Sequence, residues 1–498
     1  MKSAAGQDPY QTSNDDLYRT CIRKSQIIDA VIYQGVIPSL PLFILMMMQQ
    51  LDGHGSVDAT NGLYGSLYEV IINDVIKEGT SNPAEIKTII NYLTEYSNYV
   101  FTRKISYVEE TEFIHWHNEY CAKFNRRINY SEVLIQLEAI GVFRRQEGII
   151  GFKYKYYYWY FVAKYLANHI YDSNVFSVIS SLTLCLHLDD AANIMLFLCH
   201  FSKDPRILQM ILNQVKTHFK DNPEFDLSKS PHVLPTGTTY LSTLTLSTTP
   251  PYGERVKALQ EQDAHSRPNG LGEVAPCLVP DEEDQTEMSL VHEVSSASHL
   301  IRICGQIIRN FYGDMPGEAQ EAIIRECYGL SLRIMSVLFN HIEVDKDLIA
   351  GTIAKILQQR NPKLVGTELD QSVRRSLKTV ALQITYGYIK HVSNSIGLLD
   401  LETSFDKVLS MEGTTVSHKL LDISTRLDFF DHFPESKILE VSSKINRTDI
   451  GFEVLRILTW EHFKLFKSDY KIRQRICNKL DIKFNEQSFL DMKDKKVS

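Results

Sequence analysis

The stretch VFRRQEGIIGF, at residues 142–152, interrupts the helical pattern that fills most of this 498-residue chain. It contains two short runs of residues that favour β-strands, and Gly148 lies in the turn between them. Glycine adopts the backbone angles of tight turns without steric cost. The stretch therefore predicts a β-hairpin.

Helices are predicted on both sides of this hairpin. One is expected from Tyr107 to Phe124 and a shorter one from Ser131 to Ile140, where the Ser131 side chain could cap free backbone N–H groups. A third helix, from Tyr156 to His169, follows the hairpin. Two helices, a hairpin and a third helix give the outline of a winged-helix domain.

A winged helix raises a DNA-binding hypothesis, because basic residues lie near the hairpin: Arg126, Arg127, Arg144, Arg145, Lys153 and Lys155. The second helix argues against it. Recognition helices read base edges with Arg, Lys, Asn or Gln, whereas residues 131–140 offer Glu132, Gln136 and Glu138 and no Lys or Arg. Because these carboxylates would repel phosphate, we favour packing against protein over nucleic-acid binding.

Outside this unit the sequence is mostly helical. Apolar residues recur every three or four positions up to residue 222 and again after residue 288, a pattern typical of helices that bury one face. One stripe consists of Ile349, Ile353, Ile356 and Leu357, and Pro362 follows where it ends. No fixed repeat with signature residues is visible, so we expect an irregular helical array.

The segment at residues 223–287 has a different composition. It holds eight of the sixteen prolines and the acidic cluster at residues 281–284. Such a segment cannot bury enough apolar surface to offset the entropy lost on ordering. We therefore predict a disordered or loop linker.

The predicted fold is mainly α, with a helical bundle and a winged-helix domain followed by an irregular helical array. The predicted domains are a small helical domain at residues 1–104, the winged helix at 105–170, a helical connector at 171–222, the linker at 223–287 and a helical sensor-like array at 288–498.

The composition is that of an ordinary globular protein, with 44% hydrophobic and 23% charged residues. A net charge of −8 gives no bulk attraction for polyanions. The eight cysteines lack the two-residue spacing of zinc knuckles, so we interpret them as reduced thiols.

The N-terminus lacks a signal-peptide pattern, and the most apolar run, Leu40–Met48, is too short to cross a bilayer. We expect a cytoplasmic protein without a membrane partner.

The block FKYKYYYWYFVAKYLA, at residues 152–167, resembles the end of the winged-helix domain in STAND NTPases of the NACHT-like group. Their pattern is F-x-H-x-x-F-x-E-Y-F-x-A, followed by an aromatic residue and Leu. This chain matches at Phe152, Tyr160, Phe161, Ala163 and Leu166. The same aromatic residues would also suit a core helix, and the two interpretations are compatible.

Two further blocks are similar to the same family, in the same order. IPSLPLF at residues 37–43 resembles a segment of the small helical domain that touches the nucleotide base, which implies that Pro41 contacts nucleotide. The blocks at residues 303–313 and 328–333 resemble helices downstream of the winged helix in bacterial members.

Tyr154 stands where the family has the His of F-x-H, which touches the β-phosphate of ADP in many members. A tyrosine hydroxyl can donate a hydrogen bond to phosphate but cannot become cationic. The resemblance implies a nucleotide contact at Tyr154. The alternative is a core or surface tyrosine without a ligand.

The sequence contains no G-x-x-x-x-G-K-[ST] loop to hold phosphates and no evident strand ending in paired acidic residues for Mg²⁺. The resemblance implies that the chain begins after the family's nucleotide-binding core. It would then be a separate gene product or the remainder of a split protein. We therefore expect no enzyme activity and no cofactor in this chain, and ATP or ADP only when it pairs with such a core.

Other candidate sites are weak. His115 and His117 diverge on a helix, so we expect no metal site there. Cys199-His200 and the Asp189-Asp190 pair could form a nucleophile and base, but nothing in the sequence orients them. A buried thiol and a helix cap are the better interpretations.

The leading hypothesis is a non-catalytic sensor and regulatory part of a bacterial STAND-type NTPase system for signal transduction. The resemblance implies antiviral, specifically antiphage, defence. Its partners would be a nucleotide-binding core and a protein trigger, with oligomerisation on activation. The alternatives are a free-standing helical scaffold for protein interactions and a winged-helix nucleic-acid binder.

Overall fold

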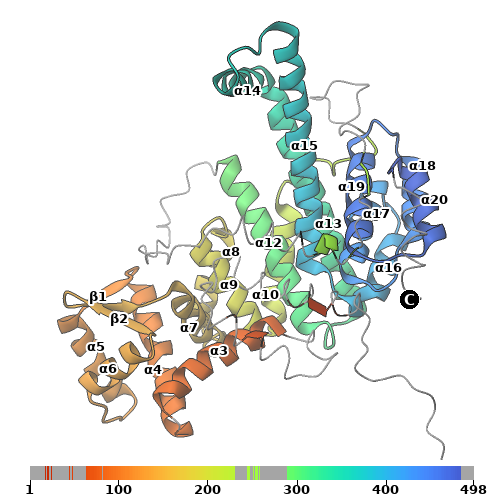
Figure 1. Cartoon of the computed structure of the whole chain (residues 1–498). Coiled ribbons are helices and arrows are strands. Elements are labelled where there is room, and N and C mark those ends of the chain that lie inside the picture. The colour runs from red at the N-terminus through yellow and green to blue at the C-terminus, as the bar shows by residue number, and fades with distance from the viewer. Residues whose placement is uncertain are drawn as a thin grey trace, which may run out of the picture. The chain divides into compact units, whose positions relative to one another are not determined.

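The computed structural model describes residues 63–80, 82–229 and 289–483, and a few isolated positions in the remaining segments. As predicted, the protein is mainly α (Figure 1). It forms two compact units. The first comprises residues 24–215 and 267–315, and the second comprises residues 1–23, 216–266 and 316–498.

The first unit contains the three strands found in the described residues. Its elements are α3 (Leu63–Gly79), α4 (Pro83–Thr102), β1 (Tyr107–Glu109), α5 (Glu110–Lys123), α6 (Tyr130–Ala139), β2 (Phe143–Gln146), β3 (Ile149–Phe152), α7 (Lys155–Asn168), α8 (Ser173–Leu184), α9 (Asp189–Phe201), most of α10 (Pro205–Thr217) and α12 (Leu290–Phe311).

The predicted hairpin is present as β2 and β3. Glu147 and Gly148 both have positive φ angles, of 53° and 79°, as two-residue hairpin turns require. The strand β1 pairs with the other edge of β3, so the antiparallel sheet has the order β1-β3-β2.

The predicted helix from Tyr107 to Phe124 is wrong at its start, because residues 107–109 form β1. This strand is three residues long and exists through its pairing with β3, in which Val108 lies opposite Ile150. At the same edge the Tyr107 ring packs against Gly151, where an added Cβ would lie 2.7 Å from the ring. Local periodicity does not reveal such a contact.

The cap predicted at Ser131 is also wrong. The N-cap of α6 is Asn129, whose side-chain oxygen accepts the Ser131 backbone N–H at 2.9 Å. A cap side chain bonds the backbone two or three residues further on, and the helix begins one residue before Ser131.

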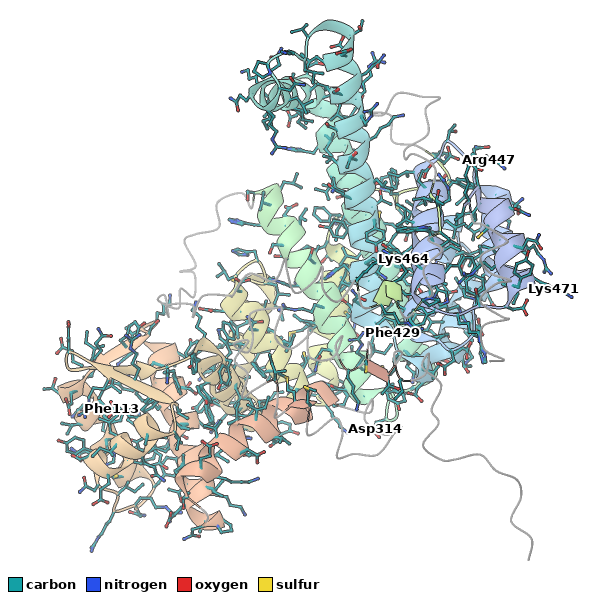
Figure 2. All side chains as sticks on the ribbon, viewed as in Figure 1. Phe113, Asp314, Phe429, Arg447, Lys464 and Lys471 are labelled. Atoms are coloured by element: carbon teal, nitrogen blue, oxygen red, sulfur yellow. The ribbon has the colours of Figure 1, made fainter. Side chains whose placement is uncertain are left out.

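The core of the first unit is rich in aromatic side chains. Tyr92 and Tyr96 of α4 contact the Trp116 ring of α5 edge-on, with ring centres 4.8 and 4.9 Å apart. Tyr96 also packs against Phe143 of the sheet at 5.0 Å. Phe113, labelled in Figure 2, lies in the same cluster and is fully buried. Helix α7 packs between α4 and α9, so nine of its fourteen residues are buried.

In the second unit, every element named in the described residues is a helix. Its elements are α13 (Gly317–Val344), α14 (Lys346–Arg360), α15 (Gly366–Ile396), the short 3-10 helix η2 (Leu399–Leu401), α16 (Glu402–Ser410), α17 (Val416–Phe429), α18 (Glu435–Lys444), α19 (Ile450–Leu465) and α20 (Tyr470–Leu480).

Helix α12 packs against α9 and belongs to the first unit. Our division of the chain, which starts the C-terminal array at residue 288, groups this helix differently. The predicted boundaries at residues 104 and 170 fall inside the first unit.

Residues 223–229, the start of the predicted linker, form a loop that is packed into the second unit. The Leu227 side chain is fully buried, and its backbone N–H donates to the Ser417 hydroxyl at 2.8 Å. The Gly451 N–H donates to the Leu227 carbonyl at 3.2 Å. Most of the predicted linker lies outside the described residues.

Candidate functional site

Tyr154 occupies the junction between β3 and α7. It is the N-cap residue of α7 and has extended backbone angles, φ −131° and ψ 141°, and its side chain makes no capping hydrogen bond. The ring is half-buried and stacks on the Tyr156 ring, with centres 5.9 Å apart and planes at 17°. Within the described part of the chain, no residue hydrogen-bonds to the Tyr154 hydroxyl.

Two lysines flank Tyr154 at the start of α7. The ammonium group of Lys153, an exposed residue, lies 5.5 Å from the centre of the Tyr154 ring. Lys155 lies 3.5 Å from a carboxylate oxygen of Asp190 and is partly neutralised by it. Because the N-terminus of a helix carries partial positive charge, this surface favours an anionic group. The Tyr154 hydroxyl could donate a hydrogen bond to such a group.

The body of α7 holds this junction in place. Phe161 is fully buried and lies edge-on to Tyr160, whose ring packs against Phe197 of α9 at 5.7 Å. Burial raises the pKa of Tyr157 and of Tyr160 far above the usual range, so both hydroxyls stay protonated. These tyrosines therefore fix the start of α7 and carry no charge there.

Asp190 has a role that our sequence analysis missed. We interpreted the Asp189-Asp190 pair as a helix cap, but Asp190 accepts a hydrogen bond from the indole Nε1 of Trp159 at 2.9 Å. This bond joins α7 to the first turn of α9. The signal in the sequence was an acidic pair opening a helix, which does not identify the partner.

Pro41, the second residue predicted to contact nucleotide, lies outside the described residues. Its position relative to Tyr154 stays a prediction. The site that the structure does describe therefore consists of Tyr154, the flanking lysines and the aromatic helix behind them.

His115 and His117, for which we expected no metal site, lie in different surroundings, one exposed and one buried. His115 is exposed and lies 3.2 Å from Glu119. His117 is buried, shares a hydrogen bond of 2.9 Å with the Tyr92 hydroxyl, and bonds the Ile128 carbonyl through its other ring nitrogen. Across the described ranges, no three His, Cys, Asp or Glu side chains are grouped as a metal site requires.

Burial shifts the pKa values of both Cys199 and His200. Burial raises the pKa of the Cys199 thiol far above its usual range, which keeps the sulfur protonated and poorly nucleophilic. Burial lowers the pKa of His200 to about 4. Asp190 bonds Trp159, and among the described residues no hydrogen bond or ion pair joins it to Cys199 or His200.

No helix in the described part of the chain is long and apolar enough to cross a membrane. This observation agrees with the sequence, whose longest apolar run is short.

Comparisons with known proteins match one part of the chain. A family model described as novel STAND NTPase 4 matches residues 106–162, from the residue before β1 to the middle of α7. No curated protein and no solved structure matched the chain. The matched segment includes the whole sheet, α5, α6, Tyr154 and Phe161. Over this segment, the chain is therefore similar to the STAND NTPases.

Proposed function

We propose that this chain is a non-catalytic regulatory part of a bacterial STAND-type NTPase system. In this proposal, residues 106–162 act as a winged helix that rests against a nucleotide-binding core outside these 498 residues. The helices of the second unit receive a protein trigger, and activation leads to oligomerisation. The proposed setting is antiphage defence in the cytoplasm, by analogy with NACHT-like proteins.

One observation carries the proposal. The segment similar to the STAND family ends in the middle of α7, and Tyr154 lies at the N-terminus of that helix with no hydrogen-bond partner among the described residues. Lys153 and the positive end of the helix lie beside it. A hydroxyl on a half-buried tyrosine in a cationic setting suits the terminal phosphate of a nucleoside diphosphate.

The proposed switch follows from this geometry. When the core holds ADP, the Tyr154 hydroxyl donates a hydrogen bond to the terminal phosphate and keeps the winged helix docked. Because a tyrosine side chain cannot become cationic, this contact would lack the positive charge that a protonated histidine brings to phosphate. Trigger binding to the second unit would compete with the docked state.

The test uses the tagged chain together with the P-loop protein that copurifies with it from its native host. We expect Tyr154→Phe to weaken ADP binding by the complex by about 1.5–3 kcal/mol, the usual worth of a hydrogen bond to a charged group. The variant should also raise basal activation, measured as oligomer formed without trigger. The matched control is Tyr107→Phe, at a tyrosine of the same segment that is 43% exposed.

Two results would contradict the proposal. One is ADP affinity and basal activation in Tyr154→Phe equal to those of Tyr107→Phe. The other is saturable ATP binding by the purified chain alone in calorimetry, because the proposal places the phosphate-binding loop in another polypeptide or domain.

A further inference from the structure

Helices α14 and α15 form a hairpin that projects from the rest of the second unit (Figure 1). Residues 361–365 connect them, and α14 packs along the N-terminal part of α15. Helix α14 is 15 residues long and has no buried residue. The stripe Ile349, Ile353, Ile356 and Leu357, which the sequence predicts to be core, is therefore only partly covered.

The uncovered surface of this hairpin is apolar in several places. Leu348, Ile356 and Val365 are 72%, 45% and 62% exposed, respectively, and Val344, the last residue of α13 just before the hairpin, is 82% exposed. Leu348 and Ile356 are eight residues apart, so they lie about two turns apart on one side of α14. Clustered apolar side chains on a soluble protein mark surfaces that bind a partner.

The same hairpin is basic within an acidic chain. Residues 346–378 hold seven Lys or Arg and three Asp or Glu, a charge of +4, whereas the whole chain carries −8. Lys355, Arg360, Lys363, Arg374 and Arg375 are all exposed, and none has an ion-pair partner among the described residues. On α14, Lys355 comes seven residues after Leu348, about two turns along the same side of the helix, so cationic and apolar groups share one surface.

We propose that the α14–α15 hairpin is the docking surface for an acidic amphipathic helix of a protein partner. The apolar side of that helix would cover Leu348 and Ile356, and its carboxylates would meet Lys355 and Arg374. A nucleic acid would use the cations but leave the apolar residues exposed, so the pairing of both features favours a protein helix. This partner would be the protein trigger of the proposed function, on which the inference rests.

The probe is a synthetic helical peptide with leucines on one face and glutamates on both flanks. Binding is measured by fluorescence anisotropy with the full chain and no nucleotide. We expect saturable binding that weakens with salt, about tenfold loss in Lys355→Glu/Arg374→Glu, and comparable loss in Leu348→Asp/Ile356→Asp. The charge control is Arg447→Glu/Lys471→Glu, two exposed cations of the same unit labelled in Figure 2.

A scrambled peptide of the same composition tests the need for an apolar face. The apolar control is Val291→Asp, at a residue of α12 that is 74% exposed. Neither Arg447→Glu/Lys471→Glu nor Val291→Asp should change the affinity for the probe.

Several results would overturn the proposal. They are no saturable binding of the peptide, equal binding of the scrambled peptide, or losses matched by the control variants. Tighter binding of a DNA duplex or of phosphatidylserine vesicles, lost in Lys355→Glu/Arg374→Glu but kept in Leu348→Asp/Ile356→Asp, would assign the surface to that ligand instead. Self-association of the chain through this surface would assign it to a second copy. The peptide assay contains no nucleotide, so a negative result in it does not bear on ADP binding at Tyr154. The two proposals can therefore fail separately.

Discussion

The indole N–H of Trp159 donates a hydrogen bond of 2.9 Å to the Asp190 carboxylate, which joins the middle of α7 to the first turn of α9. Trp159 is 4% exposed, so its N–H has little access to bulk water. The bond explains how the buried, aromatic first half of α7 accommodates Trp159 without leaving its indole donor unpaired.

Removal of this acceptor should destabilise the first unit. We expect Asp190→Ala to lower the free energy of unfolding by about 1–3 kcal/mol, because it leaves a buried N–H without a partner. The adjacent Asp189→Ala is the matched control, since the Asp189 side chain is 85% exposed, and it should change stability by less than about 0.5 kcal/mol. Urea unfolding followed by tryptophan fluorescence measures both. Equal effects of the two variants would contradict the role of Asp190.

The close approach of Leu227 to α19 should make Gly451 intolerant of a side chain. A Cβ at Gly451 would overlap the Leu227 carbonyl oxygen, so Gly451→Ala should destabilise the second unit by about 1–3 kcal/mol. The control is Gly387→Ala in α15, where an added Cβ meets no atom within 4 Å. That variant should stabilise the protein by about 0.5–1 kcal/mol, because alanine favours helix over glycine. Thermal unfolding of the two variants would reveal the opposite signs, and a stable Gly451→Ala protein would argue against the packed loop.

His200 should make the first unit less stable in mild acid. Burial lowers its pKa from 6.5 to about 4, with nearby Lys164 acting in the same direction and Glu69 opposing it. Between these values the unfolded chain binds a proton that the folded chain does not, so the free energy of unfolding falls as the pH falls from 6.5 to 4.

The measurement compares urea unfolding at pH 7 and pH 5 for the wild type and His200→Gln. The variant should lose part of the pH dependence of the wild type. His115→Gln, at an exposed histidine, serves as the control and should retain all of it. Retention of the full dependence in His200→Gln would show that other groups cause it.

Much of the fold follows from local patterns in the sequence. The apolar periodicity after residue 288 predicted helices that bury one face, and in α12 the structure buries Leu300, Ile303 and Ile307. The β2–β3 hairpin follows from Gly148 and the β-prone residues on either side. Helix periodicity and turn chemistry depend on neighbours within a few residues, so they can be read without knowing the tertiary structure.

The candidate site was only partly visible in the sequence. Tyr154 was identified from its place in an aromatic block, but its position as the N-cap of α7 beside Lys153 depends on where β3 ends and α7 begins. Asp190 was missed because its partner, Trp159, lies 31 positions away in the sequence. Hydrogen bonds between distant residues leave no periodic signal.

The sequence by itself therefore determined the helical class, the hairpin and the block at residues 152–167 that resembles STAND NTPases. Only the tertiary structure decided that Tyr107–Glu109 is a strand, that Leu227 is buried, and that the apolar stripe of α14 is left partly uncovered. The physical reason is the range of the contacts. A strand three residues long or a buried loop residue is stabilised by partners far along the chain, and an apolar stripe shows only that a helix has a face to bury, not whether anything covers it.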